Sequence, residues 1–343
     1  MNQIKHIDEA VGQLAPETAA RFGLTLLGVM TTSVLGAYVL TALYRVRPPE
    51  IVNTFSILFF AGLLSTALLG VLGCVAWLGF RGEREPIRKL REMPCWSAQF
   101  IWTRAAPVMI TMVFLGSCGT YKAMIPYINP FWADALFSNA DRLMFGTDPW
   151  RLTHALIGQT GTRILDIIYG LWFPAWVFTL IYFGCFAQES EQRRFLTAFY
   201  LVWIFEGIVL ATFLSSVGPV YLKLIHNPDA VRYVGLFPID APGAARAQSM
   251  LAASYLNGSV GAFKGISAMP SLHVGIAALL VLAWQRQPLL FGFAIVFWIL
   301  VSVASVHLGW HYAVDGIVAS ISSALIWYVC GQRQLRGGQT GAG

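Results

Sequence analysis

Long apolar segments recur along the chain and constrain its fold more than any other feature. About twenty apolar residues are enough to cross the hydrocarbon core of a bilayer. Segments of this kind lie near 23–44, 53–80, 99–121, 165–187, 195–217, 270–286, 288–306 and 312–331. Hydrophobic residues make up 57% of the chain and charged residues only 12%, which excludes an ordinary soluble domain. The sequence therefore predicts an all-α, polytopic membrane bundle of about eight transmembrane helices.

Charged loops predict the orientation of this bundle. The segment 81–94 holds five Lys or Arg residues, and short basic loops of this kind stay in the cytoplasm. With an even number of spans both termini are then cytoplasmic, and the long connections 122–164 and 218–269 lie on the outer face. Within the first connection, 131–146 and 148–158 mix apolar and charged residues as interfacial helices do. The compact loops favour a bacterial inner membrane.

We expect one membrane domain with four parts. In chain order they are a cytoplasmic N-terminal segment (1–22), two additional transmembrane helices with a cytoplasmic loop (23–97), a six-helix core (98–331) and a cytoplasmic tail (332–343). The five cysteines are scattered and show neither metal-ligand nor disulfide spacing. The net charge of +6 is not gathered into a basic domain. Anionic lipid is therefore a better partner for this chain than nucleic acid.

The pair His311 and Asp315 carries the clearest chemical signal. The two residues stand four positions apart in SVHLGWHYAVDG, at the start of the last apolar segment, and so share one helix face. A carboxylate there can fix the imidazole tautomer and leave the other nitrogen free to attack or to bind a metal. His273 begins the sixth predicted span and Lys122 ends the third. His307 and His311 both lie between the seventh and eighth predicted spans. The topology therefore brings Lys122, His273, His307 and His311 to the outer face, where such residues tend to be functional.

Each of these residues also has a structural interpretation. His311 and Asp315 could form a structural hydrogen-bonded pair, and His273 could bond a carbonyl at the interface. Lys122 could be a snorkelling side chain at a helix end. A zinc site of the two histidines and Asp315 would lack a further acidic or Cys ligand at helical spacing, so we expect no metal. Taken together, the residues favour a nucleophile, an orienting carboxylate and a general acid.

Three stretches resemble the type 2 phosphatidic acid phosphatase superfamily, whose signatures are Lys-x6-Arg-Pro, Pro-Ser-Gly-His and Ser-Arg-x5-His-x3-Asp. They are KAMIPYINP (122–130), PSLH (270–273) and ASVHLGWHYAVD (304–315). The resemblance covers roughly the C-terminal two thirds of the chain. It implies that 98–331 is a lipid phosphotransferase or phosphatase core that works without a metal or other cofactor.

The resemblance also implies a role for each matching residue. His311 would be the nucleophile that forms a phosphohistidine, Asp315 its orienting partner, and His273 the acid that protonates the leaving oxygen. Lys122 and Ser271 would hold phosphate oxygens. Such a set is chemically coherent, because attack on phosphorus needs an oriented base, an acid for the alkoxide and donors around the phosphoryl oxygens.

The chain departs from the signatures at three positions. Asn129 and Ser305 stand where the signatures have arginine, and Leu272 stands where they have glycine. Two bidentate guanidiniums suit a dianionic phosphate monoester, whereas a lipid phosphodiester carries one negative charge. The departures therefore favour a diester donor, with Asn129 and Ser305 facing its phosphate.

The sequences PSLH and HYxxD resemble those of inositol phosphorylceramide synthases and related sphingolipid head-group transferases. That branch implies transfer of a phospho-head group from a phospholipid to a lipid alcohol such as ceramide. One alternative is a lipid phosphate phosphatase acting on phosphatidate, a sphingoid phosphate or a polyprenyl phosphate. Another is a lipid-binding membrane protein without catalytic activity.

Five further residues are candidates for a role at or near the site. Glu206 is the one carboxylate deep inside a predicted span, where it either relays protons or pairs with a buried hydroxyl or amide. Lys264, Arg142, Arg232 and Arg246 could supply the positive charge missing at the two signature arginines, or could simply contact solvent and lipid head groups.

Overall fold

The computed structural model describes residues 16–46, 101–236, 240–261 and 264–339, together with Val75, Glu85 and Arg88. The secondary structure of these residues is helical, with no strand among them. Helices satisfy their own backbone groups, which is what lipid requires of a spanning chain. The predicted all-α polytopic bundle is confirmed. Apart from the three single residues, the second predicted span (53–80) and the basic loop 81–94 lie outside the described residues.

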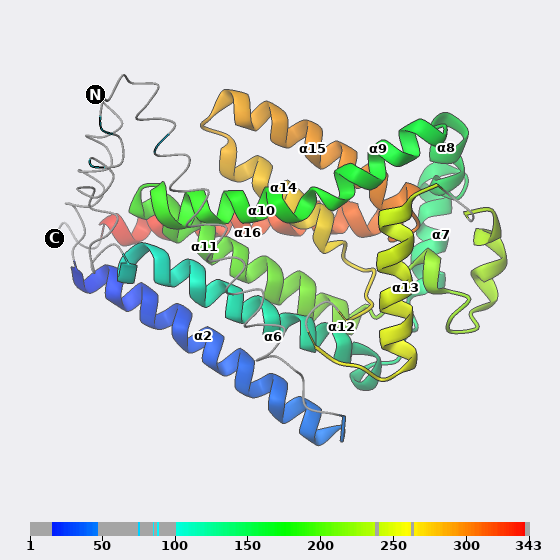
Figure 1. Ribbon diagram of the computed structural model, residues 1–343, viewed down its shortest axis with the longest axis horizontal. Coiled ribbons are helices and arrows are strands. Elements are labelled where there is room, and N and C mark those ends of the chain that lie inside the picture. Colours follow the sequence, from blue (N-terminus) through cyan, green and yellow to red (C-terminus); the bar gives the residue numbers. More distant parts are fainter. Residues whose placement is uncertain are drawn as a thin grey trace.

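The longer α-helices run roughly along the long axis of the molecule, whereas α7, α8 and α13 lie across it (Figure 1). Their bounds are α2 (Pro16–Leu43), α6 (Ala106–Ile128), α7 (Asp134–Phe145), α8 (Pro149–Leu156), α9 (Gln159–Gly170), α10 (Trp172–Ile181), α11 (Glu189–Ile204), α12 (Ala211–Phe213), α13 (Pro242–Leu256), α14 (Leu272–Trp284), α15 (Pro288–His307) and α16 (Ala313–Gln339). Single π-helical turns occupy Ile101–Ala105, Tyr182–Phe186 and Phe205–Leu210, and 3₁₀ turns occupy Pro219–Tyr221 and Pro228–Leu236.

Six helical stretches in the described part of the chain are long and apolar enough to cross a membrane. They are Arg21–Leu43, Trp102–Ile128, Gln159–Phe186, Glu189–Phe213, Pro288–His307 and Ala313–Gln332. Each corresponds to a predicted span, and the protein is therefore a multi-pass membrane protein. The third and fourth begin more than a turn before the predicted residues 165 and 195, because these helices continue through polar residues that hydropathy alone does not detect.

The sixth predicted span is much shorter than its neighbours. It is α14, whose thirteen residues rise about 20 Å, against about 30 Å for the twenty residues of α15. Ten of the thirteen are buried, as expected for a helix that is apolar on all sides and lies in the centre of a bundle. His273 lies in the first turn of this short helix, which packs among the longer α11, α15 and α16.

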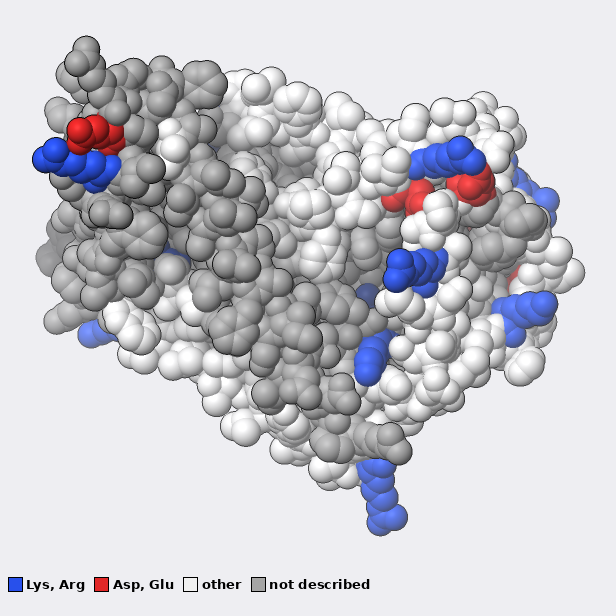
Figure 2. Space-filling view, in the orientation of Figure 1, with Lys and Arg blue, Asp and Glu red and all other residues white. Residues whose placement is uncertain are grey.

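The helices α7, α8 and α13 lie together at the end of the bundle away from the start of α2 (Figure 1). On the face drawn in Figure 2, charged side chains gather over that end, while the described surface between the two ends is mostly uncharged. The helices predicted within 131–146 and 148–158 are present as α7 and α8. Their contact with a membrane surface stays a prediction. The three helices form a polar cap beside the start of α14.

Glu206 is fully buried and joins three helical segments. Its Oε1 accepts hydrogen bonds from the hydroxyls of Ser322, at 2.5 Å, and Ser323, at 2.8 Å, both on α16. Its Oε2 faces Gly275 of α14, where an added Cβ would come within 2.1 Å. A buried carboxylate requires partners of this kind. The contacts support the structural interpretation of Glu206.

We expect Glu206→Gln to keep both the thermal stability and the turnover of the wild type, because the amide oxygen can still accept a serine hydroxyl. Glu206→Ala removes both hydrogen bonds and leaves a cavity, which should lower the free energy of unfolding by about 2–4 kcal/mol. Thermal unfolding of the purified protein in detergent measures both variants. A Gln variant with wild-type stability but no turnover would contradict this account and support a proton relay.

Candidate active site

His311 lies in the turn between α15 and α16 and is 6% exposed. Its Nδ1 is 2.8 Å from the backbone oxygen of Ala268. Because a carbonyl oxygen only accepts, we assign the ring proton to Nδ1, which leaves the lone pair of Nε2 free. The Ala268 carbonyl thus fixes the tautomer that a nucleophilic imidazole needs.

Asp315 lies slightly farther from the imidazole than this carbonyl does. Its Oδ2 is 3.5 Å from His311 Nδ1 and accepts the backbone N–H of Tyr312 at 2.9 Å. Its Oδ1 is buried and has no hydrogen-bond partner among the residues that the structure describes. The carboxylate is therefore placed to stabilise a positive charge that develops on the ring, while the Ala268 carbonyl is the closer acceptor.

The surroundings keep His311 uncharged. Burial, reinforced by the positive charge of Lys122 and opposed by the bond to the Ala268 carbonyl, lowers the pKa of the His311 imidazole to about 3. The ring is therefore neutral near pH 7, as a nitrogen nucleophile must be.

His273 lies in the first turn of α14 and faces His311, with 6.3 Å between the ring centroids. Its ring stacks on that of Tyr169, with 4.5 Å between the centroids, and lies against that of Trp172, with 4.1 Å between the centroids. The indole N–H of Trp172 also donates to the His273 carbonyl at 3.0 Å. Within the described residues, neither ring nitrogen of His273 has a hydrogen-bond partner. The aromatic wall holds the ring and leaves both nitrogens available.

Lys122 brings a positive charge to the same place. Its charge acts on both His273 and His311, and no carboxylate of the described residues lies within ion-pair distance of it. The backbone of Gly265 rests on the backbone of Lys122, because an added Cβ would lie 2.4 Å from the Lys122 carbonyl carbon. Glycine thus lets the segment that leads into α14 pass directly beside the lysine. The structure places Lys122 near His273 and His311, whereas the ring of His307 bonds the hydroxyls of Thr153 and Thr162.

The predicted phosphate-binding serines both bond to protein atoms. Ser271 caps α14, since its hydroxyl accepts the backbone N–H of Val274 at 3.4 Å. The hydroxyl of Ser305 donates to the Ser302 carbonyl at 2.8 Å, and its own carbonyl accepts the N–H of His311 at 3.1 Å. Both serines support the backbone around the histidines, and their contact with phosphate stays a prediction.

Asn129 follows the last residue of α6. Its side-chain amide donates to the backbone oxygen of Thr212 at 2.8 Å and to that of Phe213 at 3.4 Å. The side chain that replaces the first signature arginine is therefore used to join α6 to α12. Its role at the phosphate stays a prediction.

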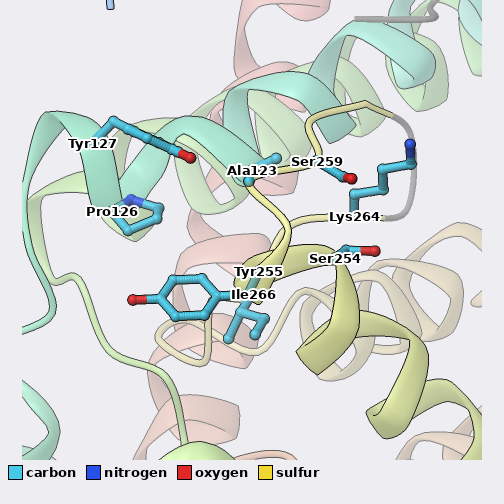
Figure 3. A pocket seen from close by; sticks show the side chains of 9 residues that line it. Ala123, Pro126, Tyr127, Ser254, Tyr255, Ser259, Lys264 and Ile266 are labelled. Atoms are coloured by element: carbon cyan, nitrogen blue, oxygen red, sulfur yellow. The ribbon is translucent and has the colours of Figure 1, made fainter. Parts of the chain in front are cut away.

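A shallow hollow opens beside Lys122, between the end of α6, the end of α13 and the segment that leads into α14. Figure 3 shows the side chains around it, which include Lys264 and the hydroxyls of Tyr127, Tyr255, Ser254 and Ser259. None of the described residues that line it is acidic. The hollow offers a cation and several hydroxyl groups one residue away from Lys122.

The other three candidate cations are placed differently from Lys264. Arg142 and Arg232 both form ion pairs with Asp148, which is fully buried. Arg246 is exposed on α13. Lys264 is thus the candidate whose neighbour along the chain, Gly265, packs on Lys122.

Three buried aspartates near the site were not among the predicted residues. Asp134, Asp141 and Asp148 are 0–2% exposed, although acidic side chains are seldom fully buried. For Asp134 and Asp141 the available signal was their spacing of seven residues on α7, because a helix returns to nearly the same face after seven residues. Asp148 lies beyond the end of α7, so this signal does not extend to it. Burial raises the pKa of Asp141 to about 6 despite two backbone N–H bonds that lower it, so it is ionised at neutral pH.

Comparison with known proteins identifies the family of the chain. A family model described as the PAP2 superfamily matches residues 137–329, which is more than half of the 343 residues. The match includes His273, His311 and Asp315 and begins after Lys122. No curated protein and no solved structure matches the chain. The chain belongs to the PAP2 superfamily and is an enzyme of the phosphatase type.

Proposed function

We propose that the protein is an integral membrane lipid phosphotransferase. It moves a phospho-head group from a phospholipid to a lipid alcohol such as ceramide through a phosphohistidine on His311, as inositol phosphorylceramide synthases do. The hydrogen bond from His311 Nδ1 to Ala268 carries the proposal, because it leaves Nε2 unprotonated in a buried site. A histidine kept neutral opposite a second histidine is a nucleophile and acid pair.

In the first half-reaction His311 Nε2 attacks the phosphorus of the donor. A nitrogen–phosphorus bond forms, and the bond from phosphorus to the diacylglycerol oxygen breaks. His273, protonated beside the negative charge of the bound donor phosphate, gives its proton to that oxygen, and diacylglycerol leaves. The phosphorylated imidazole carries a positive charge, which the carboxylate of Asp315, 3.5 Å from Nδ1, stabilises.

In the second half-reaction the hydroxyl of the lipid alcohol replaces diacylglycerol. Neutral His273 takes the hydroxyl proton while the oxygen attacks phosphorus. The nitrogen–phosphorus bond breaks, and His311 regains its lone pair. The enzyme returns to its starting protonation state, so the cycle needs no metal and no other reactant.

The charge around the histidines supports a diester donor. Lys122 is the cation whose charge acts on both rings, and the positions of the two signature arginines hold Asn129 and Ser305, whose side chains bond to carbonyls. A monoester dianion would lack the two bidentate guanidiniums that the signatures provide for it, whereas a phosphodiester with its single negative charge needs fewer cations.

Purified protein in detergent should transfer a labelled head group from phospholipid to ceramide or diacylglycerol, and His311→Ala should reduce the rate by at least about a thousandfold, since it removes the nucleophile. The assay scores transferred head group against released inorganic phosphate. Release of phosphate from monoesters alone would establish the phosphatase alternative. Lipid binding with no turnover of any donor would establish the non-catalytic one.

We also propose that the protein lies in a bacterial inner membrane. Its site then faces the periplasmic or lumenal side, and both termini lie in the cytoplasm. The basic loop 81–94 supports this orientation. A cysteine introduced at the exposed Arg246 of α13 should react with a membrane-impermeant maleimide in intact cells, in a background where the native cysteines are replaced. Labelling only after the inner membrane is permeabilised would contradict the orientation.

A further inference from the structure

The first helix of the polar cap, α7, places two carboxylates against the turn that carries His311. Asp134 and Asp141 are 1% and 2% exposed, and neither forms an ion pair with a described residue. Both accept hydrogen bonds from uncharged donors instead. Burying a carboxylate is costly unless its oxygens are bonded. These hydrogen bonds therefore stabilise the two buried carboxylates.

Asp141 holds the segment that follows the nucleophile. Its Oδ2 accepts the backbone N–H of Ala313 at 2.8 Å, and its Oδ1 accepts that of Val314 at 2.9 Å. These N–H groups open α16 and have no acceptor within their own helix. A carboxylate on them is also favoured by the helix dipole. The residues two and three positions after His311 are therefore fixed from α7.

Asp134 holds the other side of the site. Its two oxygens accept the N–H groups of Val217, at 3.0 Å, and Gly218, at 2.9 Å, and one of them accepts the hydroxyl of Tyr312 at 3.0 Å. Gly218 has φ +85°, and an added Cβ would lie 2.5 Å from the carbonyl oxygen of Trp310. Asp134 thus fixes the residue after His311 directly and packs a glycine loop against the residue before it.

The same loop reaches the acceptor that sets the tautomer. The carbonyl of Ser216 accepts the N–H of Ala268 at 2.9 Å, and its hydroxyl accepts the N–H of Met269 at 3.1 Å. A continuous set of hydrogen bonds therefore runs from Asp134 through the loop at Ser216 to Ala268, whose carbonyl bonds His311 Nδ1.

We infer that Asp134 and Asp141 are positioning residues, which aim His311 Nε2 and hold its tautomer by fixing the backbone on both sides of the ring. They act through Tyr312, Ala313, Val314 and the loop at Ser216, and they do not touch the substrate. This role rests on the proposed chemistry of His311 and applies equally to transfer and to hydrolysis. Removing either carboxylate should therefore slow the chemical step and leave substrate binding unchanged.

Asp148 provides a matched control. It is as buried as the other two and stands seven residues after Asp141. Its partners are the side chains of Arg142, Arg151 and Arg232, and it bonds no residue of the His311 turn. Loss of its charge should affect the stability of the cap and not the chemical step.

The test compares Asp134→Asn, Asp141→Asn and Asp148→Asn in the full-length protein in detergent. Asparagine keeps the volume but turns an NH₂ group toward a backbone N–H. We expect kcat to fall about tenfold to a hundredfold in the first two variants, as for other residues that orient a catalytic group, with KM within twofold of the wild type. Asp148→Asn should keep kcat while its unfolding temperature falls.

Tyr312→Phe guards against variants that fail to fold, because it removes only the hydroxyl that donates to Asp134. Its kcat should fall severalfold at unchanged KM and unfolding temperature. Wild-type kcat in Asp134→Asn, Asp141→Asn and Tyr312→Phe would overturn the inference, as would equal losses of kcat in all three aspartate variants. Each enzyme is assayed with a diester and with a monoester. A wild type active only on the monoester refutes the transfer reaction, while the positioning role is still decided by phosphate release.

Discussion

The hydrogen bond between His311 Nδ1 and the Ala268 carbonyl is the interaction on which the rest of the site depends. It joins two segments that lie more than forty residues apart, the entry to α14 and the turn before α16. It decides which nitrogen is free, and burial decides that the free nitrogen carries no proton. The tautomer and charge of His311 are thus set before His273, Asp315 and Lys122 act on it. Asp141 hydrogen-bonds the backbone that follows His311, and Asp134 hydrogen-bonds the loop that in turn bonds Ala268.

The membrane setting explains why the site is built in this way. Irregular backbone at such a depth needs a partner for every N–H and C=O. Around the site, Asp141 accepts the N–H groups of Ala313 and Val314, and Ser216 accepts those of Ala268 and Met269. The architecture and the chemistry therefore follow from one arrangement of helices.

The lengths of the apolar segments predicted the helical bundle. The order of the motifs along the spans predicted that Lys122, His273, His311 and Asp315 meet, because the order of the spans decides which residues lie at the same end of the bundle. The partner of His311 could not be predicted, since a backbone carbonyl has no sequence signature; the i,i+4 spacing pointed to Asp315 instead. The internal bonds of Asn129 and Ser305 were equally hidden. Their contacts come from α12 and from the helix that Ser305 itself belongs to, and neither follows from a phosphatase motif.

The most direct test of the account is the position of the phosphoryl group on a trapped intermediate. Wild-type protein is quenched during turnover of a labelled phospholipid without acceptor, digested at alkaline pH and analysed by tandem mass spectrometry against synthetic phosphohistidine isomers. The account predicts phosphorylation of His311 at Nε2, because Nδ1 donates to Ala268. Phosphorylation at Nδ1 of His311, or at any other residue, would contradict it.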